Sequence, residues 1–126
     1  MTPVRIQRKR TKGFDLQSLS ISVNGLPAAC VDRSSRYGNP YVVKRNGKGW
    51  SVENSSGIWL FETKEKAHLA ASKLFRAWID APQNSSLKRR GVLALRDRNL
   101  ACFCSLTEAC HADVWLEMLK NEGISS

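Results

Sequence analysis

The segment from Thr63 to Pro82 constrains the fold more than any other part of the chain. Its small and apolar residues recur at helical spacing along one stripe, at Ala67, Ala70, Ala71, Leu74, Trp78 and Ala81. This spacing predicts a helix over 64–81 with one buried face. Thr63 is a good N-cap, and Pro82 ends the helix. His68 lies near the stripe, and we expect it to be a surface or boundary residue, not a ligand.

Short apolar stretches at 28–31 and 100–104 flank this helix in the sequence and are predicted strands. A connection that contains a helix of this length makes the two strands parallel, with a right-handed crossover. A last helix is predicted over 110–121, and it ends before Gly123, a residue type that often follows a helix end. The fold class is therefore α/β: a small Rossmann-like sheet with parallel core strands and helices packed on it.

A β-meander is predicted at 40–62, inserted between the first parallel strand and the main helix. Its turns are rich in Asn and Gly, and its strands lie at 41–45, 50–53 and 58–61.

Three other segments are less regular. The alternating residues at 19–23 precede Asn24-Gly25 and predict a strand that enters a tight turn. Residues 83–90 are predicted to form a polar, then basic, connection. The pattern at 92–95 fits either a helical turn or a strand.

Positive charge is concentrated at the start of the chain. The 126 residues carry 20 Lys and Arg against 11 Asp and Glu, a net charge of +9. Residues 1–48 hold ten basic and two acidic residues, a net of +8, whereas 49–126 hold ten and nine, a net of +1. Such asymmetry favours a polyanionic partner, a nucleotide or nucleic acid, because each neutralised phosphate releases counterions. The alternative is a basic N-terminus that only maintains solubility.

A chain of this length typically holds one domain. Residues 1–13 contain no acidic residue and are predicted to form a basic N-terminal arm ahead of a single α/β domain at 14–126. The candidate nucleic-acid contacts of the arm are Arg5, Arg8, Lys9, Arg10 and Lys12. No apolar run reaches the roughly 20 residues of a membrane span, and the first residues lack the apolar core of a secretory signal. We therefore expect a cytoplasmic protein without a membrane partner.

Three of the four cysteines, Cys102, Cys104 and Cys110, lie within nine residues, and His111 follows directly. Cys102 and Cys104 are two apart on a predicted strand, so their side chains point to one face. Cys110 and His111 stand at a predicted helix start, where free N–H groups lower the pKa of a thiol and attract anions. The fourth cysteine, Cys30, is expected to be a small buried apolar residue.

Three interpretations of this segment remain open. Cys102, Cys104, Cys110 and His111 match the ligand types of a Cys₃His zinc site, although their spacings are tighter than usual. Alternatively, the segment is an anion-binding or nucleophilic loop in which Cys110, His111 and Asp113 carry the chemistry. In the third interpretation the cysteines are buried apolar residues and His111 caps the helix.

The second polar constellation is the loop at 32–40, which has the sequence Asp-Arg-Ser-Ser-Arg-Tyr-Gly-Asn-Pro. Arginine side chains bind phosphate oxygens with two parallel hydrogen bonds, glycine permits close backbone approach, and an asparagine amide reads hydrogen-bonding edges. The candidate ligand-binding residues are Arg33, Arg36, Tyr37, Gly38 and Asn39. A solvated turn with incidental arginines is the alternative.

The two polar segments are predicted to face each other. Each follows the carboxyl end of a parallel strand, and open α/β sheets bind their ligands at that edge. We therefore expect a shared site for the phosphate of a nucleotide or nucleic acid, and the pattern does not decide whether the site is catalytic.

Five segments, taken in order, resemble a known family. They are 6–13 (IQRKRTKG), 32–41 (DRSSRYGNPY), 75–79 (FRAWI), 100–104 (LACFC) and 110–114 (CHADV). Together they resemble the domain of unknown function (DUF) 4326 family, which is found largely in phages, prophages and their bacterial hosts.

The resemblance implies a small mobile-element protein of the host-cell cytoplasm, in which the Gly-Asn-Pro loop and the Cys-Cys-Cys-His segment form one site. It implies no particular reaction. Tyr37 and Phe103 stand where the family pattern has Trp, so aromatic replaces aromatic. A zinc-stabilised DNA-binding module and a phage inhibitor that binds a host protein remain as alternatives.

Overall fold

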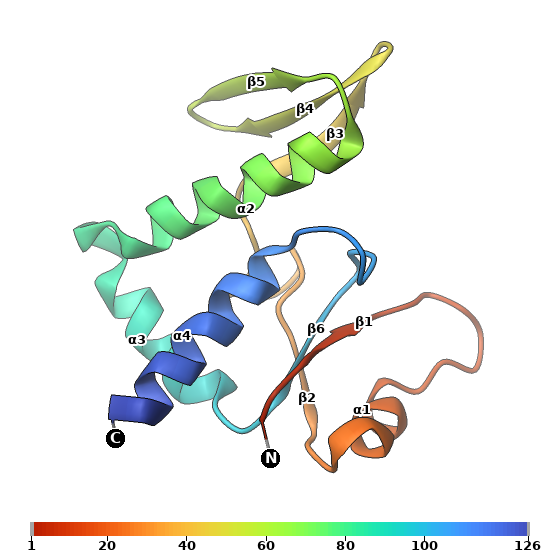
Figure 1. The fold of residues 1–126 in the computed structure, drawn as a ribbon, viewed down its shortest axis with the longest axis vertical. Coiled ribbons are helices and arrows are strands. Elements are labelled where there is room, and N and C mark those ends of the chain that lie inside the picture. The colour runs from red at the N-terminus through yellow and green to blue at the C-terminus, as the bar shows by residue number, and fades with distance from the viewer. Residues whose placement is uncertain (1, 126) are drawn as a thin grey trace.

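The chain folds into a mixed α/β structure with two separate three-stranded sheets (Figure 1). The computed structural model describes residues 2–125, with side chains through residue 121. The elements in chain order are β1 (Arg5–Gln7), α1 (Leu16–Asn24), β2 (Ala28–Cys30), β3 (Val42–Asn46), β4 (Gly49–Asn54), β5 (Gly57–Phe61), α2 (Lys64–Asp80), a 3₁₀ turn (Pro82–Asn84), α3 (Ser85–Leu95), β6 (Asn99–Cys102) and α4 (His111–Ser125). No helix within residues 2–125 is long and apolar enough to cross a membrane.

The first sheet is parallel, with β6 between β1 and β2. All four residues of β6 are buried, and Ala101 pairs with Ile6 on one side and Cys30 on the other. The predicted parallel relation of 28–31 and 100–104 is confirmed. Residues 5–7, which lie within the segment predicted as a basic arm, form the strand β1.

The second sheet is antiparallel, in the order β3-β4-β5, and its strands match the three predicted between residues 40 and 62. Figure 1 shows this sheet lying against the N-terminal part of α2.

Helix α2 connects two hydrophobic cores. Ala67 and Ala71, in its first half, are buried with Val52 of the antiparallel sheet. Phe75 and Ile79, in its second half, are buried in the main core with residues of β6, α3 and α4. The helix predicted at 64–81 from its apolar stripe is therefore confirmed. Because it packs in both cores, this helix positions the two sheets relative to each other.

The predicted strand at 19–23 is wrong, because these residues belong to helix α1. Asp15 caps this helix by accepting a hydrogen bond from the Ser18 N–H (3.1 Å), and Gly25 ends it in the left-handed conformation with φ of 82°. Asn24-Gly25 is thus a helix terminus and not a hairpin turn. The alternating Ile21 and Val23 are exposed rather than buried on one face of a sheet.

Two helix boundaries also differ from the prediction. Residues 85–90 are helical, within α3, and not a polar connection, and the undecided residues 92–95 complete the same helix. The last helix runs past Gly123 to Ser125. One glycine does not end a helix unless the chain adopts a left-handed turn there.

Substitution of Gly91 by Ala is expected to destabilise the fold. A Cβ atom at Gly91 would lie well inside van der Waals contact of the Trp115 indole. This ring cannot move aside easily, because it is fully buried and its Nε1–H donates to the Tyr37 carbonyl (3.0 Å). Overpacking costs about 1–3 kcal/mol, more than the gain in helix propensity of up to about 1 kcal/mol.

The control is Gly57→Ala, because a Cβ there meets nothing closer than a Trp59 ring carbon at 3.9 Å. Denaturant unfolding of both variants measures the difference. Equal stability of Gly91→Ala and the unaltered protein would contradict this packing.

Candidate metal and ligand site

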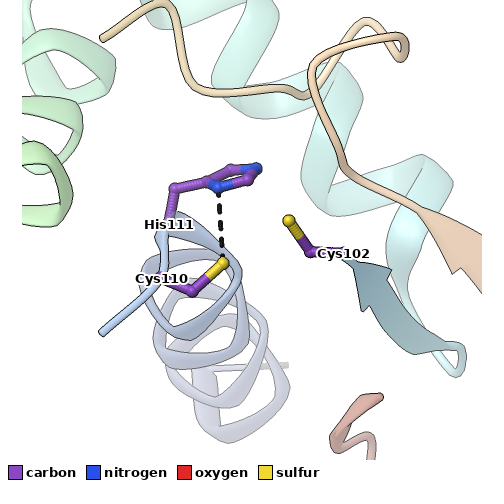
Figure 2. Close-up of side chains that lie close together, drawn as sticks. All are labelled: Cys102, Cys110 and His111. Carbon is purple, nitrogen blue, oxygen red and sulfur yellow. Dashed lines mark hydrogen bonds between the residues drawn. The ribbon is translucent and has the colours of Figure 1, made fainter. Parts of the chain in front are cut away.

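The end of β6 and the start of α4 bring three metal-ligating side chains together. Cys102 is the last residue of β6, His111 is the first of α4, and Cys110 precedes it. All three are buried, and their ligand atoms lie within 4.8 Å of one another. Figure 2 shows the Cys110 thiol and the His111 ring facing the thiol of Cys102, which lies at the end of β6.

Two short distances define this group, and a fourth side chain joins it. The Sγ atom of Cys110 lies 3.6 Å from Nδ1 of His111. The Sγ atoms of Cys102 and Cys104 lie 3.7 Å apart, so Cys104 joins the group through Cys102. The four residues Cys102, Cys104, Cys110 and His111 therefore form one Cys/His cluster, which could hold a metal ion.

The backbone directly after β2 orients the His111 ring. Its Nε2 atom hydrogen-bonds to the carbonyl oxygen of Val31. Because a carbonyl only accepts, Nε2 carries the proton, and Nδ1 presents its lone pair to the thiols. Burial lowers the pKa of His111, which keeps the imidazole neutral at pH 7. Metal-bound histidines are commonly oriented in this way by a second hydrogen bond.

The pKa values of the three thiols in the Cys/His cluster are shifted in opposite directions. Hydrogen bonds from Cys104 and then Cys110 lower the pKa of Cys102 far below that of a free thiol. The hydrogen bond to Cys102 raises the pKa of Cys104, and the same interaction raises that of Cys110. A buried Cys110 with a raised pKa is a poor nucleophile, because the thiolate is the reactive form.

The loop after β2 is organised by Asp32, which is buried. One carboxylate oxygen accepts hydrogen bonds from the backbone N–H and hydroxyl of Ser34, and the other pairs with Arg8 at 2.6 Å. The same hydrogen bond raises the pKa of Arg8.

The contacts of Gly38 and Asn39 hold the loop in its conformation rather than present groups to a ligand. A Cβ at Gly38 would lie 2.7 Å from Cα of Arg33, so glycine is required by the close approach of the loop to itself. The Asn39 amide donates to the Ala71 carbonyl (3.1 Å) and accepts from the Tyr41 N–H (2.9 Å). Asn39 thereby fastens the loop to α2.

One cavity of about 430 Å³ joins the loop and the Cys/His cluster. Its wall includes Asp32, Arg33 and Asn39 from the loop and the whole Cys/His cluster from the other segment. The expected meeting of the two polar segments is confirmed.

The candidate ligand-binding residues divide into two groups. Arg33 is exposed and lines the cavity together with Asn39. Arg36, Tyr37 and Gly38 do not line it. The Tyr37 ring packs edge-on against Trp115, with ring centres 5.6 Å apart, so it belongs to the core.

The N-terminal basic residues have different environments. The Arg10 guanidinium lines the cavity and lies over the Phe103 ring, 3.9 Å from its centre. Lys9 and Lys12 are exposed. Arg8 forms an ion pair with Asp32 and lies over the Phe103 ring. Arg5 donates a hydrogen bond to the Ser105 carbonyl, between Cys104 and Cys110.

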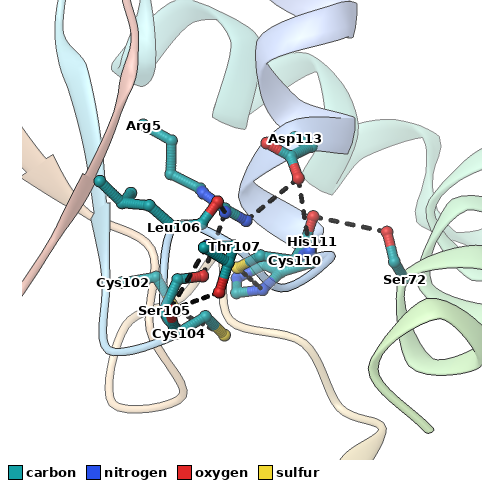
Figure 3. A network of polar contacts seen from close by, with 10 residues as sticks. All are labelled: Arg5, Ser72, Cys102, Cys104, Ser105, Leu106, Thr107, Cys110, His111 and Asp113. Atoms are coloured by element: carbon teal, nitrogen blue, oxygen red, sulfur yellow. Dashed lines mark hydrogen bonds and ion pairs between the residues drawn. The ribbon is translucent and has the colours of Figure 1, made fainter. Parts of the chain in front are cut away.

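Arg5 organises the chain between Cys104 and Cys110, as Figure 3 shows. Its guanidinium donates to the carbonyls of Ser105 (3.2 Å) and Leu106 (2.8 Å) and pairs with Asp113 at 3.1 Å. Its side chain is only 9% exposed, whereas that of Asp113 is 53% exposed. Asp113, predicted as a catalytic residue with Cys110 and His111, does not line the cavity.

His68, Tyr41 and Ser72 also line the cavity, although they are not among the predicted site residues. His68 and Ser72 lie four residues apart on α2 and share one face of the helix, but the sequence does not show that this face borders the cavity. His68 is a boundary residue, as expected, with a side chain 14% exposed.

The family model described as a domain of unknown function (DUF4326) matches residues 6–121. The chain belongs to this family. The match begins within β1, ends in α4, and includes the loop at 32–40 and the Cys/His cluster. No curated protein and no solved structure matches this DUF4326 chain.

Substitution of Arg5 by Met is expected to destabilise the protein by about 2 kcal/mol. It keeps the aliphatic stem but removes hydrogen bonds to two carbonyls and a carboxylate. Two of these bonds are exposed to solvent, so we expect the total loss to be that of about one charge-assisted hydrogen bond, about 1.5–3 kcal/mol. Lys12→Met, at an exposed position of the same basic segment, is the control and should change the free energy of unfolding by less than about 0.5 kcal/mol. Chemical denaturation measures both, and equal stabilities would refute the role of Arg5.

Proposed function

We propose that this chain is a zinc protein whose cavity binds a phosphate-bearing nucleotide. One observation carries the proposal: a single cavity is bounded by the Cys/His cluster and by two guanidinium side chains, Arg10 and Arg33. Thiols and an imidazole are zinc ligands, and guanidinium groups are phosphate ligands.

The cluster fits zinc in ligand type, and two of its ligand-atom distances match a zinc site. Zn–S and Zn–N bonds of about 2.3 and 2.0 Å in a tetrahedron separate neighbouring ligand atoms by roughly 3.5–3.8 Å. The Cys102–Cys104 distance is 3.7 Å and the Cys110–His111 distance is 3.6 Å. Thiolate ligands disfavour magnesium and calcium, which prefer oxygen.

Bound zinc would have a structural role. Its ligands would come from the end of β6 and the start of α4, so it would close the intervening chain onto the sheet. Because His111 also holds the Val31 carbonyl, the metal would fix the loop after β2 as well. Four protein ligands leave no open position, which is typical of structural sites.

The rest of the cavity suits a nucleotide. Its volume of about 430 Å³ lies within the usual 300–1,000 Å³ of small-ligand sites. Arg10 and Arg33 offer charged donors for phosphate, and Tyr41 provides aromatic surface for a base or sugar. Both arginines are exposed and so are accessible to a ligand.

A nucleic-acid strand is the second candidate, and the exposed Lys9 and Lys12 favour it. They flank Arg10, which lies at the cavity, so a strand entering the cavity would pass the most basic part of the chain. Its affinity would fall steeply with salt, because the phosphates of a bound strand release counterions.

Purified protein is expected to contain one zinc per chain. Cys102→Ser should lose the metal and lower the melting temperature by at least about 10 °C, roughly 3 kcal/mol, because structural zinc contributes directly to folding. Cys30→Ser is the matched control, since Cys30 is half-buried in β2, outside the Cys/His cluster. Elemental analysis and thermal unfolding measure both effects, and a Cys102→Ser variant with full zinc would exclude this ligand set.

Arg33→Ala is expected to weaken nucleotide binding about tenfold or more, the value of one charge-assisted hydrogen bond. Arg36→Ala is the control, because Arg36 is exposed on the same loop but does not line the cavity. Calorimetric titration with nucleoside monophosphates at constant salt separates the two. Equal losses would show that only net charge matters, and the cavity would not be the binding site.

A further inference from the structure

The cavity contains one histidine outside the Cys/His cluster. His68 projects from α2, and its Nε2 atom lies 2.8 Å from the Oε2 atom of Glu108. The other carboxylate oxygen, Oε1, lies 3.2 Å from the Lys64 ammonium. Glu108 is thus held between two side chains of α2, and it fixes the ring of His68.

This contact determines which atom of the ring faces a ligand. An ionised carboxylate oxygen offers only lone pairs, so a ring nitrogen this close to it carries the proton, and Nδ1 has a free lone pair. Nδ1 makes no hydrogen bond among residues 2–125, yet every buried side-chain nitrogen and oxygen described there has a partner. Nδ1 is therefore not fully buried, and His68 lines the cavity.

The ring remains an acceptor at neutral pH. Burial lowers the pKa of His68, and this effect exceeds the opposing attraction of Glu108. The neutral ring then offers a lone pair to the cavity, in contrast to the donors of Arg10 and Arg33. Ionised phosphate oxygens are also acceptors and cannot bind such an atom, whereas a sugar hydroxyl or a base amino group can.

We infer that His68 is a specificity-determining residue that accepts a hydrogen bond from a hydroxyl or amino group of the ligand. The inference depends on the proposed function and deepens it. The cavity then distinguishes a nucleotide from inorganic phosphates, because only the nucleotide satisfies both the arginines and His68. Glu108 is a positioning residue, since it acts through the ring.

The test compares two probes by calorimetric titration of the zinc-containing full chain: the four ribonucleoside 5′-monophosphates and inorganic pyrophosphate. His68→Phe keeps a ring and removes the acceptor. It should weaken the binding of the preferred nucleotide about fivefold to tenfold, the value of one hydrogen bond, and change that of pyrophosphate less than twofold. His68→Gln restores an acceptor oxygen and should recover part of the lost affinity. Zinc content and melting temperature should stay those of the unaltered protein.

A second measurement needs no substitution. In uniformly ¹⁵N-labelled protein, the Nδ1 resonance of His68 should shift on saturation with the nucleotide and stay unchanged with pyrophosphate. An unchanged resonance with both probes, or equal affinity losses for both probes in His68→Phe, would overturn the inference while leaving the phosphate site intact. Failure of the unaltered protein to bind either probe would instead overturn the proposed function, and the inference with it.

Discussion

The hydrogen bond between His111 and the Val31 carbonyl is the interaction on which the site depends. It joins the end of β2 to the start of α4, so it connects the two polar segments directly. It also fixes the imidazole with its lone pair toward the cysteines. A buried carbonyl without this partner would be costly, and a freely rotating imidazole would be a weaker ligand. The same bond thus supports the fold and prepares a metal site.

Much of the fold could be predicted because its signals agree with one another. In α2, the N-cap Thr63, the apolar stripe and Pro82 all define the same helix. In α1, the alternation of Leu19, Ile21 and Val23 is compatible with a strand or an exposed helix. The N-cap Asp15 and the C-cap Gly25 favour the helix. Short segments carry too few residues for periodicity alone to separate these states. The helix α3 contains Gly91, a poor helix former, because only glycine leaves room for the Trp115 ring.

The candidate site could be predicted in part. Residue types and spacing point to the Cys/His cluster, and strand topology places it opposite the loop at 32–40. The roles of Arg5 and His68 could not be predicted, because they depend on which edge β1 occupies and how α2 is rotated. Arg5 resembles any basic surface residue in sequence, yet it holds two backbone carbonyls and Asp113. Charge alone does not distinguish a side chain that binds phosphate from one that binds its own chain.

The most direct test of the account is zinc K-edge X-ray absorption of the purified, unaltered protein. The account predicts a first shell of three sulfurs at about 2.3 Å and one nitrogen at about 2.0 Å. That result would place Cys102, Cys104, Cys110 and His111 around one ion and bring the two polar segments to a common centre. A first shell without sulfur, or a protein that retains no zinc when purified without chelators, would contradict it.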